Sequence, residues 1–171
     1  IGATALADVD GDGDLDLIAS GSNATGARLD RYVNGGSGVF TASSFGTAVY
    51  FSSSSLGDLD GDGDLDLVVS GTSNGVASGA KLSVYLNSGG GAFSAPATIA
   101  GVHYGSTSLG DVDGDGDLDL VVTGWDTASV RRLDRYLNDG LGAFAGPTPF
   151  GVGVAATSSA VLGDLDGDGD L

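Results

Sequence analysis

An acidic ten-residue motif recurs through this sequence and constrains the fold more than any other feature. The first copy occupies residues 8–17 and reads Asp-Val-Asp-Gly-Asp-Gly-Asp-Leu-Asp-Leu. Further copies begin at Asp58, Asp111 and Asp164, so the starts are 50, 53 and 53 residues apart, and the fourth copy is present through its eighth position. Repetition at a period of about 50 residues indicates a repeat architecture in which each unit is one supersecondary element.

A second landmark follows each complete acidic motif. It is Tyr-Val-Asn or Tyr-Leu-Asn, at residues 32–34, 85–87 and 136–138, and a Gly-Val-Phe or Gly-Ala-Phe sequence comes shortly after it. The Asn- and Gly-rich stretch between the two suits a hairpin, because these residues tolerate the positive φ angles of tight turns. Two landmarks in constant order predict that the units share one local structure.

Short runs of Leu and Val between Gly, Asn and Ser predict an all-β chain with four strands in each unit. We expect first strands over 3–7, 53–57 and 107–110, second strands over 15–20, 65–70 and 118–123, third strands over 29–33, 82–86 and 133–137, and fourth strands over 39–41, 92–94 and 143–145. Four-stranded sheets of this size that stack face to face are the blades of a β-propeller. A β-solenoid is the alternative architecture, although its repeats are usually shorter.

The 171 residues fit a single repeat domain. We expect blades over residues 1–50, 51–103 and 104–156, with residues 157–171 as the start of a further blade. Ordinary propellers close with about four to eight blades. The sequence therefore predicts a partial ring, which either continues in a longer chain or is completed by further copies of this one; an unusual closed or solenoidal form is the third alternative.

The spacing of the aspartates predicts a calcium site in each acidic motif. Calcium takes about six to eight oxygen ligands, and carboxylates at motif positions 1, 3, 5 and 9 can converge on one ion where a glycine at position 6 lets the backbone turn sharply. Position 7 is expected to contribute its backbone carbonyl. The predicted ligands are Asp8, Asp10, Asp12, Asp14 and Asp16; Asp58, Asp60, Asp62, Asp64 and Asp66; Asp111, Asp113, Asp115, Asp117 and Asp119; and, in the fourth motif, Asp164, Asp166, Asp168 and Asp170.

Other interpretations of the motif fit less well. An EF-hand needs an acid at position 12, where this chain has Ala19, Val69 and Val122. A Gly-Asp β-helix would repeat every nine residues, and an acidic turn without a metal would leave its crowded carboxylates in mutual repulsion. Magnesium prefers fewer protein ligands and a tighter octahedron.

The amino-acid composition excludes several classes of partner and of chemistry. The chain has 23 acidic residues, all of them Asp, against 6 basic ones, and its net charge of −17 disfavours nucleic acid and anionic membrane surfaces as partners. No apolar run is long enough for membrane insertion, and the absence of Cys excludes disulfides and thiolate chemistry. Equal copies of a metal loop argue against paired-carboxylate hydrolysis, and the single histidine, His103, joins no Ser-His-Asp set. We therefore expect no enzyme.

The acidic motifs, together with Tyr-Leu-Asn-x-Gly and Gly-Ala-Phe, closely resemble FG-GAP-like (VCBS) repeats, and they are similar to the calcium-bearing blades of integrin α-subunit propellers. The Phe-Gly pair of the family name is present loosely, as Phe45-Gly46, Tyr104-Gly105 and Phe150-Gly151. The resemblance implies an extracellular or cell-surface β-propeller with one structural calcium per blade, on the hairpin between the first and second strands. It also implies a structural or adhesive module, or one that recognises carbohydrate or protein.

A partner site is expected on the rim opposite the acidic motifs. Strand alternation places the connections between second and third strands there, at residues 21–27, 71–80 and 124–130, and these vary in length and sequence. Variable loops on a rigid scaffold are where binding usually resides. Trp125 and Asp126 are the candidate ligand residues, since a Trp beside an Asp could stack on a sugar ring; the alternative is that Trp125 packs between blades. His103 is expected to pack in the interior.

Overall fold

The computed structural model describes residues 2–153, 159–164 and 171, and its regular structure is almost entirely antiparallel β. The elements are β1 (Ala3–Ala7), β2 (Asp16–Asn23), β3 (Gly26–Asn34), β4 (Phe40–Gly57), β5 (Asp66–Thr72), the 3₁₀ helix η1 (Ala77–Gly79), β6 (Ala80–Tyr85), β7 (Ala97–Ile99), β8 (Thr107–Gly110), β9 (Asp119–Trp125), β10 (Arg131–Tyr136) and β11 (Thr148–Pro149). No helix in the described part of the chain has the length and apolar composition needed to span a membrane.

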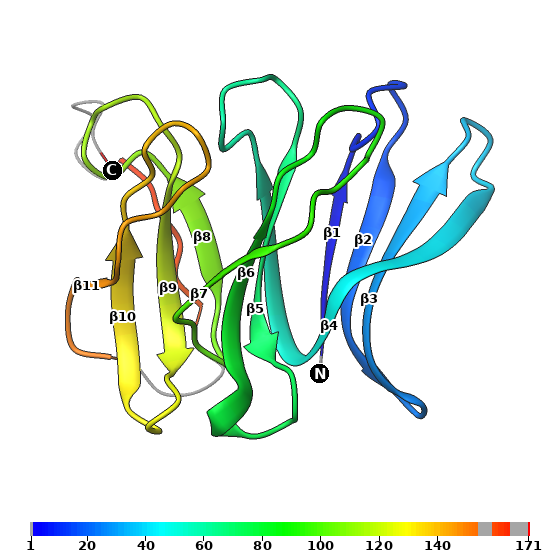
Figure 1. Cartoon of the computed structure of the whole chain (residues 1–171). Coiled ribbons are helices and arrows are strands. Elements are labelled where there is room, and N and C mark those ends of the chain that lie inside the picture. The colour runs from blue at the N-terminus through cyan, green and yellow to red at the C-terminus, as the bar shows by residue number, and fades with distance from the viewer. Residues whose placement is uncertain (1, 154–158, 165–170) are drawn as a thin grey trace.

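The strands form three four-stranded units that stand side by side (Figure 1). Strands β1 to β7 pair in sequence order, and β8 to β11 form a separate sheet of their own. Strand β4 belongs to two units, because residues 40–49 pair with β3 and residues 50–57 pair with β5. Register shifts accompany this change of partner, between Arg28 and Asp30 on β3 and between Tyr50 and Ser53 on β4. We call the three units the first, second and third blades.

The predicted first, second and third strands are confirmed, but the predicted fourth strands of the second and third blades are wrong. Residues 92–94 and 143–145 contribute only the isolated bridges Asn87–Phe93 and Asn138–Phe144. Regular pairing with the third strand begins later, at β7 and β11. Pro96 and Pro147 immediately precede β7 and β11, and proline has no N–H to donate to a ladder. The first blade has no proline at this point, and β4 runs on from Phe40.

Two apolar clusters fill the spaces between blades. Leu67 and Val69 of β5 pack in the cluster shared with the first blade, whereas Val68 packs in the cluster shared with the third. Strand β5 is buried along its whole length. A central strand that is apolar on both faces is therefore covered on both faces, as stacked blades require.

A recurrent tyrosine joins each blade to the one before it. The Tyr85 hydroxyl accepts a hydrogen bond from the Thr47 N–H of the first blade at 2.7 Å, and the Tyr136 hydroxyl donates to the Ala100 carbonyl of the second blade at 2.8 Å. Both side chains are almost completely buried. Tyr32, the equivalent residue of the first blade, is only half-buried.

The start of the fourth unit repeats the contacts of the third. The Ala160 N–H donates to Ser106 Oγ at 3.0 Å, just as the Thr107 N–H donates to Ser53 Oγ at 3.1 Å. The Ser108 hydroxyl donates to the Ala160 carbonyl at 2.6 Å, as the Ser55 hydroxyl does to the Thr107 carbonyl at 3.0 Å. Residues 159–164 therefore lie where the innermost strand of a further blade would begin.

Candidate metal centres

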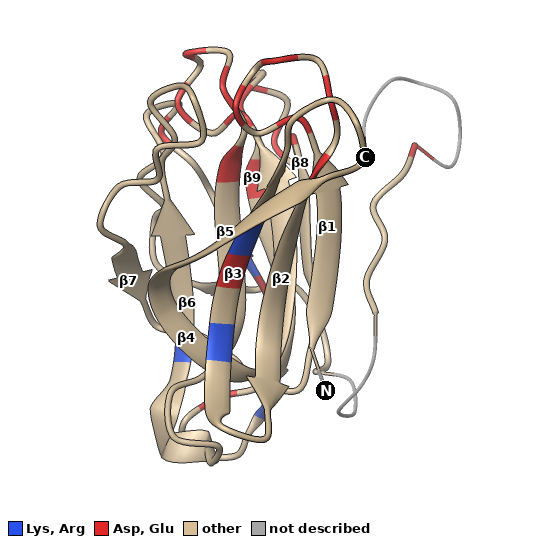
Figure 2. Ribbon diagram, turned by 90° about the vertical axis from the view of Figure 1, so that its right-hand side faces the viewer, with Lys and Arg blue, Asp and Glu red and all other residues tan. Residues whose placement is uncertain are grey.

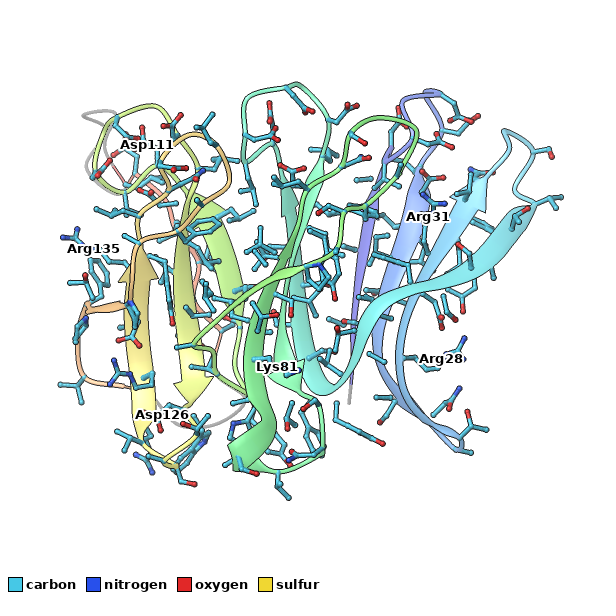
Figure 3. The ribbon with its side chains drawn as sticks, viewed as in Figure 1. Arg28, Arg31, Lys81, Asp111, Asp126 and Arg135 are labelled. Carbon is cyan, nitrogen blue, oxygen red and sulfur yellow. The ribbon has the colours of Figure 1, made fainter. Side chains whose placement is uncertain are left out.

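The acidic motifs lie where the sequence predicted them, on the turns between first and second strands. They connect β1 to β2, β4 to β5 and β8 to β9. Figure 2 shows that these turns gather most of the acidic residues at one end of the molecule. Figure 3 shows Asp111 at this end and Asp126 near the other.

The first aspartate of each motif shapes its turn. The Asp8 carboxylate accepts the Gly11 N–H at 2.8 Å and the Gly13 N–H at 2.9 Å. Both glycines have positive φ angles, 78° and 94°, which L-residues with a side chain rarely adopt. The same pair of hydrogen bonds recurs at Asp58, from Gly61 and Gly63, and at Asp111, from Gly114 and Gly116.

Each of these turns brings three carboxylates together. One carboxylate oxygen from each member of a group lies within 4.8 Å of the others, and the groups are Asp8, Asp10 and Asp16; Asp58, Asp60 and Asp62; and Asp111, Asp113 and Asp115. Motif positions 1 and 3 occur in every group. Position 9 completes the first group, and position 5 completes the second and third.

The aspartate at motif position 9 has a structural role that sequence reasoning missed. Asp66 is fully buried, and its two carboxylate oxygens accept the Leu59 N–H at 2.8 Å and the Asn87 N–H at 2.7 Å. Asp16 and Asp119 make the equivalent pairs, to Val9 and Asn34 and to Val112 and Asn138. This carboxylate therefore ties the acidic turn to the end of the third strand.

The asparagine of the Tyr-x-Asn landmark links neighbouring turns. Asn87 Nδ2 donates to the Leu65 carbonyl of its own blade at 3.2 Å and to the Val9 carbonyl of the first blade at 2.9 Å. Asn138 Nδ2 repeats this with Leu118 at 3.2 Å and Leu59 at 2.8 Å. The recurrence of this Asn was the sequence signal for its role, but a partner about 80 residues away is visible only in the fold.

Crowding changes the acidity of these carboxyl groups. Partial burial, followed by the charges of Asp16, Asp12 and Asp8, raises the pKa of Asp10 above its usual 3.8. Burial raises the pKa of Asp66 as well, although hydrogen bonds from Asn87 and Leu59 oppose the shift. Carboxylates that resist ionisation in this way gain most from a nearby cation, which would favour their charged form.

The third motif shows the same balance between crowding and hydrogen bonding. Burial and the neighbouring charges of Asp115 and Asp119 raise the pKa of Asp113. Backbone N–H donors, chiefly that of Gly114, lower the pKa of Asp111. Of the fourth motif, the structure describes only Asp164 and Leu171, so the predicted ligands Asp166, Asp168 and Asp170 lie outside the described residues.

The candidate ligand residues Trp125 and Asp126 lie at the rim opposite the acidic turns, as predicted. Strand β9 begins at Asp119 beside its acidic turn and ends at Trp125. The Asp126 side chain caps its own turn, accepting the Ala128 and Val130 N–H groups at 2.9 Å each. His103 is buried, which confirms its predicted place in the interior.

Three blade-like sheets, each with an acidic turn between its first two strands, define a protein built of propeller blades. The sequence model of the FG-GAP-like repeat matches residues 8–69, 74–122 and 111–171. The chain therefore belongs to the FG-GAP-like repeat family, as its motifs predicted. No curated protein matches the chain.

Proposed function

We propose that this chain is a calcium-binding repeat module in which one structural calcium ion holds the acidic turn of each blade. The observation that carries the proposal is the convergence of three carboxylates, within 4.8 Å of one another, in each of three equivalent turns. Calcium is a hard cation that prefers such oxygen ligands and accepts a flexible set of them. The repeated sites serve stability rather than catalysis, because three equal centres hold three equal hairpins.

Mass action gives the sign and size of the stabilisation that bound calcium would add to the folded chain. An ion that binds only the folded chain adds about 1.4 kcal/mol per site at ten times its dissociation constant. Extracellular calcium modules have dissociation constants of roughly 10⁻⁴–10⁻³ M. Several sites of this kind are significant beside a total stability of about 5–15 kcal/mol. We therefore propose that the module works outside the cell or at its surface, where calcium is abundant enough to fill such sites.

Thermal unfolding with calcium and with EGTA tests the proposal. Calcium should raise the melting temperature, and native mass spectrometry should count about three ions for the three complete motifs. Magnesium at the same concentration should have a smaller effect, because its tighter octahedron fits these turns less well. A melting temperature that is the same in calcium and in EGTA would overturn the proposal.

Three matched variants sharpen this test. Asp12→Asn, Asp62→Asn and Asp115→Asn each alter motif position 5 in one turn, and all three side chains are exposed. Each variant should lose or weaken one ion while the other two remain. Full calcium occupancy in all three variants would mean that calcium does not bind at the acidic turns.

A further inference from the structure

The third blade differs from the other two at one corner of the rim opposite the acidic turns. At this corner β9 pairs with β10 through Trp125 and Arg131. The corresponding pair is Thr72 with Ala80 in the second blade and Ser22 with Ala27 in the first. The third blade therefore places an aromatic ring and a guanidinium group where the other two have small side chains.

A small cavity, largely open to solvent, lies at this corner. It has a volume of about 290 Å³ and is lined by His103, Tyr104, Trp125 and Ser129. The Arg131 guanidinium lies over the Trp125 ring, 5.3 Å from its centre, and Arg131 is not among the lining residues. A volume at the lower end of the small-molecule range has room for a single ring.

The walls of the cavity are held in place before any ligand arrives. His103 and Trp125 exchange two backbone hydrogen bonds of 3.0 Å, and His103 Nδ1 donates to the Trp125 carbonyl at 2.8 Å. Tyr104 stacks on Phe51 of the second blade with ring centres 4.1 Å apart. Rigid aromatic walls reduce the entropy lost on binding.

Residues with strained backbone conformations lie in and beside this cavity. Among the described residues, the non-glycine residues with positive φ are Phe51, Tyr104 and Ser129, at 52°, 56° and 59°. Phe51 and Tyr104 hold equivalent positions 53 residues apart, so their conformation belongs to the repeat. The conformation of Ser129 occurs in the third blade alone among the described residues, and Ser129 lines the cavity. Strain of this kind persists where surrounding structure enforces it, which is common at binding sites.

The chemistry of the cavity selects an uncharged ligand. The net charge of −17 repels anions, and the nearby Arg131 repels cations that would otherwise suit an aromatic cage. Since His103 Nδ1 donates to the Trp125 carbonyl, Nε2 is the ring nitrogen left to bond a ligand hydroxyl. With the Ser129 hydroxyl, the site thus offers an aromatic face, an acceptor and a hydroxyl.

We propose that this corner binds one neutral pyranose ring, which packs its C–H face on Trp125 and places its hydroxyls toward His103 Nε2 and Ser129. This inference goes beyond calcium binding and depends on calcium only through the stability of the blades. It keeps Trp125 from the sequence-based hypothesis and replaces Asp126, which lines a separate cavity with Arg132 and Asp134.

Trp125 is the only tryptophan of the chain, so its fluorescence reports on the site directly. The calcium-loaded chain is titrated with methyl glycosides of glucose, galactose, mannose and N-acetylglucosamine. At least one should produce a saturable change in intensity or emission maximum in the millimolar range. Sodium glucuronate and tetramethylammonium chloride should produce none. A response to either ion alone, or no saturable response to any neutral sugar, would overturn the proposal.

Variants then locate the site. Trp125→Thr combined with Arg131→Ala rebuilds the corner of the second blade, so the fold should survive; binding, followed by saturation-transfer NMR, should disappear. Ser129→Gly tolerates the positive φ angle and should weaken binding about two- to tenfold through the lost hydroxyl. Thr127→Ala, in the same turn but lining the other cavity, is the control and should bind as the parent does.

A parallel melting curve in calcium and EGTA separates failure of this proposal from failure of the calcium proposal. If the double variant keeps the parent's calcium response and still binds the sugar, the site lies elsewhere and the inference is wrong.

Discussion

Asp62 and Asp66 belong to one acidic turn and have different physical roles. Asp62 is exposed, and among the described residues its carboxylate accepts the Asp64 N–H of the same turn, at 2.9 Å. Asp66 is fully buried and joins the turn to the end of the third strand through two backbone donors. A buried N–H without a partner is far more costly than an exposed one. The Asp66 carboxylate therefore supports the fold with or without a metal, whereas the role we propose for Asp62 is chiefly to bind the ion.

We predict that Asp66→Ala lowers the melting temperature in calcium and in EGTA alike. It leaves the Leu59 and Asn87 N–H groups buried without their acceptor, at about 1–3 kcal/mol for each group. Asp62→Ala is the matched control and should lose only the calcium-dependent part of the stability. Circular dichroism melts under both conditions give the comparison. Equal losses in EGTA for the two variants would contradict it.

At the scale of elements, each blade depends on the one before it. The third-strand tyrosine and asparagine of the second and third blades reach backbone groups of the preceding blade. The central strands bury leucines in the same interface, with Leu67 fully buried and its first-blade equivalent Leu17 only half-buried. Stability in such a chain is approximately a sum of blade and interface terms.

Leu67→Ala should destabilise the chain by about 2–5 kcal/mol, since it opens a cavity in the interface between the first and second blades. Leu17→Ala removes the same atoms from a half-buried position and should cost clearly less. Urea unfolding followed by far-ultraviolet circular dichroism measures both. Equal losses would mean that the interface between blades contributes little.

Asn138→Ala tests the polar part of the next interface, between the second and third blades. The variant removes the donor to the Leu59 carbonyl of the second blade and should cost about 1–3 kcal/mol. Asn34 is the comparison within one blade: among the described residues, its Nδ2 donates only to the Leu15 carbonyl, and its Oδ1 accepts the exposed Gly36 and Gly38 N–H groups of its own turn. If Asn34→Ala destabilised the chain as much as Asn138→Ala, the contact across blades would carry no special weight.

At the scale of the whole molecule, the first blade exposes apolar side chains on its outer face. The equivalent side chains of the second blade are covered by the first blade. Leu6 and Phe40 are 64% and 46% exposed on the first blade. Their second-blade equivalents, Leu56 and Phe93, pack in the cluster shared with the first blade. Arg31 of the first blade reaches the Gly91 carbonyl of the second, and Arg135 repeats Arg31 on the third blade. Two copies that meet through such unlike faces associate head to tail. Head-to-tail association generates a ring when the rotation from each copy to the next closes.

We predict that this chain associates with further copies of itself through the outer face of its first blade. Sedimentation velocity should show mass increasing with concentration, and Leu6→Ser combined with Phe40→Ser should abolish the increase. Leu141→Ser, which removes an equally exposed leucine from the acidic rim, is the control and should leave it unchanged. A parent chain that stays monomeric across the concentration range would refute the prediction.

Local chemistry made most of the candidate metal site predictable. The backbone turns at Gly11 and Gly13, and Asp8 accepts the N–H groups of both glycines. Both donors lie within five residues of Asp8. The strands flanking the turns followed from short apolar runs for the same reason. Sequence reasoning overlooked Pro96 after the predicted fourth strand, and it missed the structural roles of Asn87 and the buried Asp66, which depend on partners farther along the chain.

The sequence by itself determined the repeat, the acidic turns and the class of sheet, because all three depend on residues that are neighbours along the chain. Only the tertiary structure decided that β4 serves two blades, that Asn138 holds the turn of the preceding blade and that His103 supports Trp125. The contacts of His103 and Asn138 join residues about 20 and 80 positions apart along the chain, and the change of partner within β4 depends on where the first blade ends and the second begins.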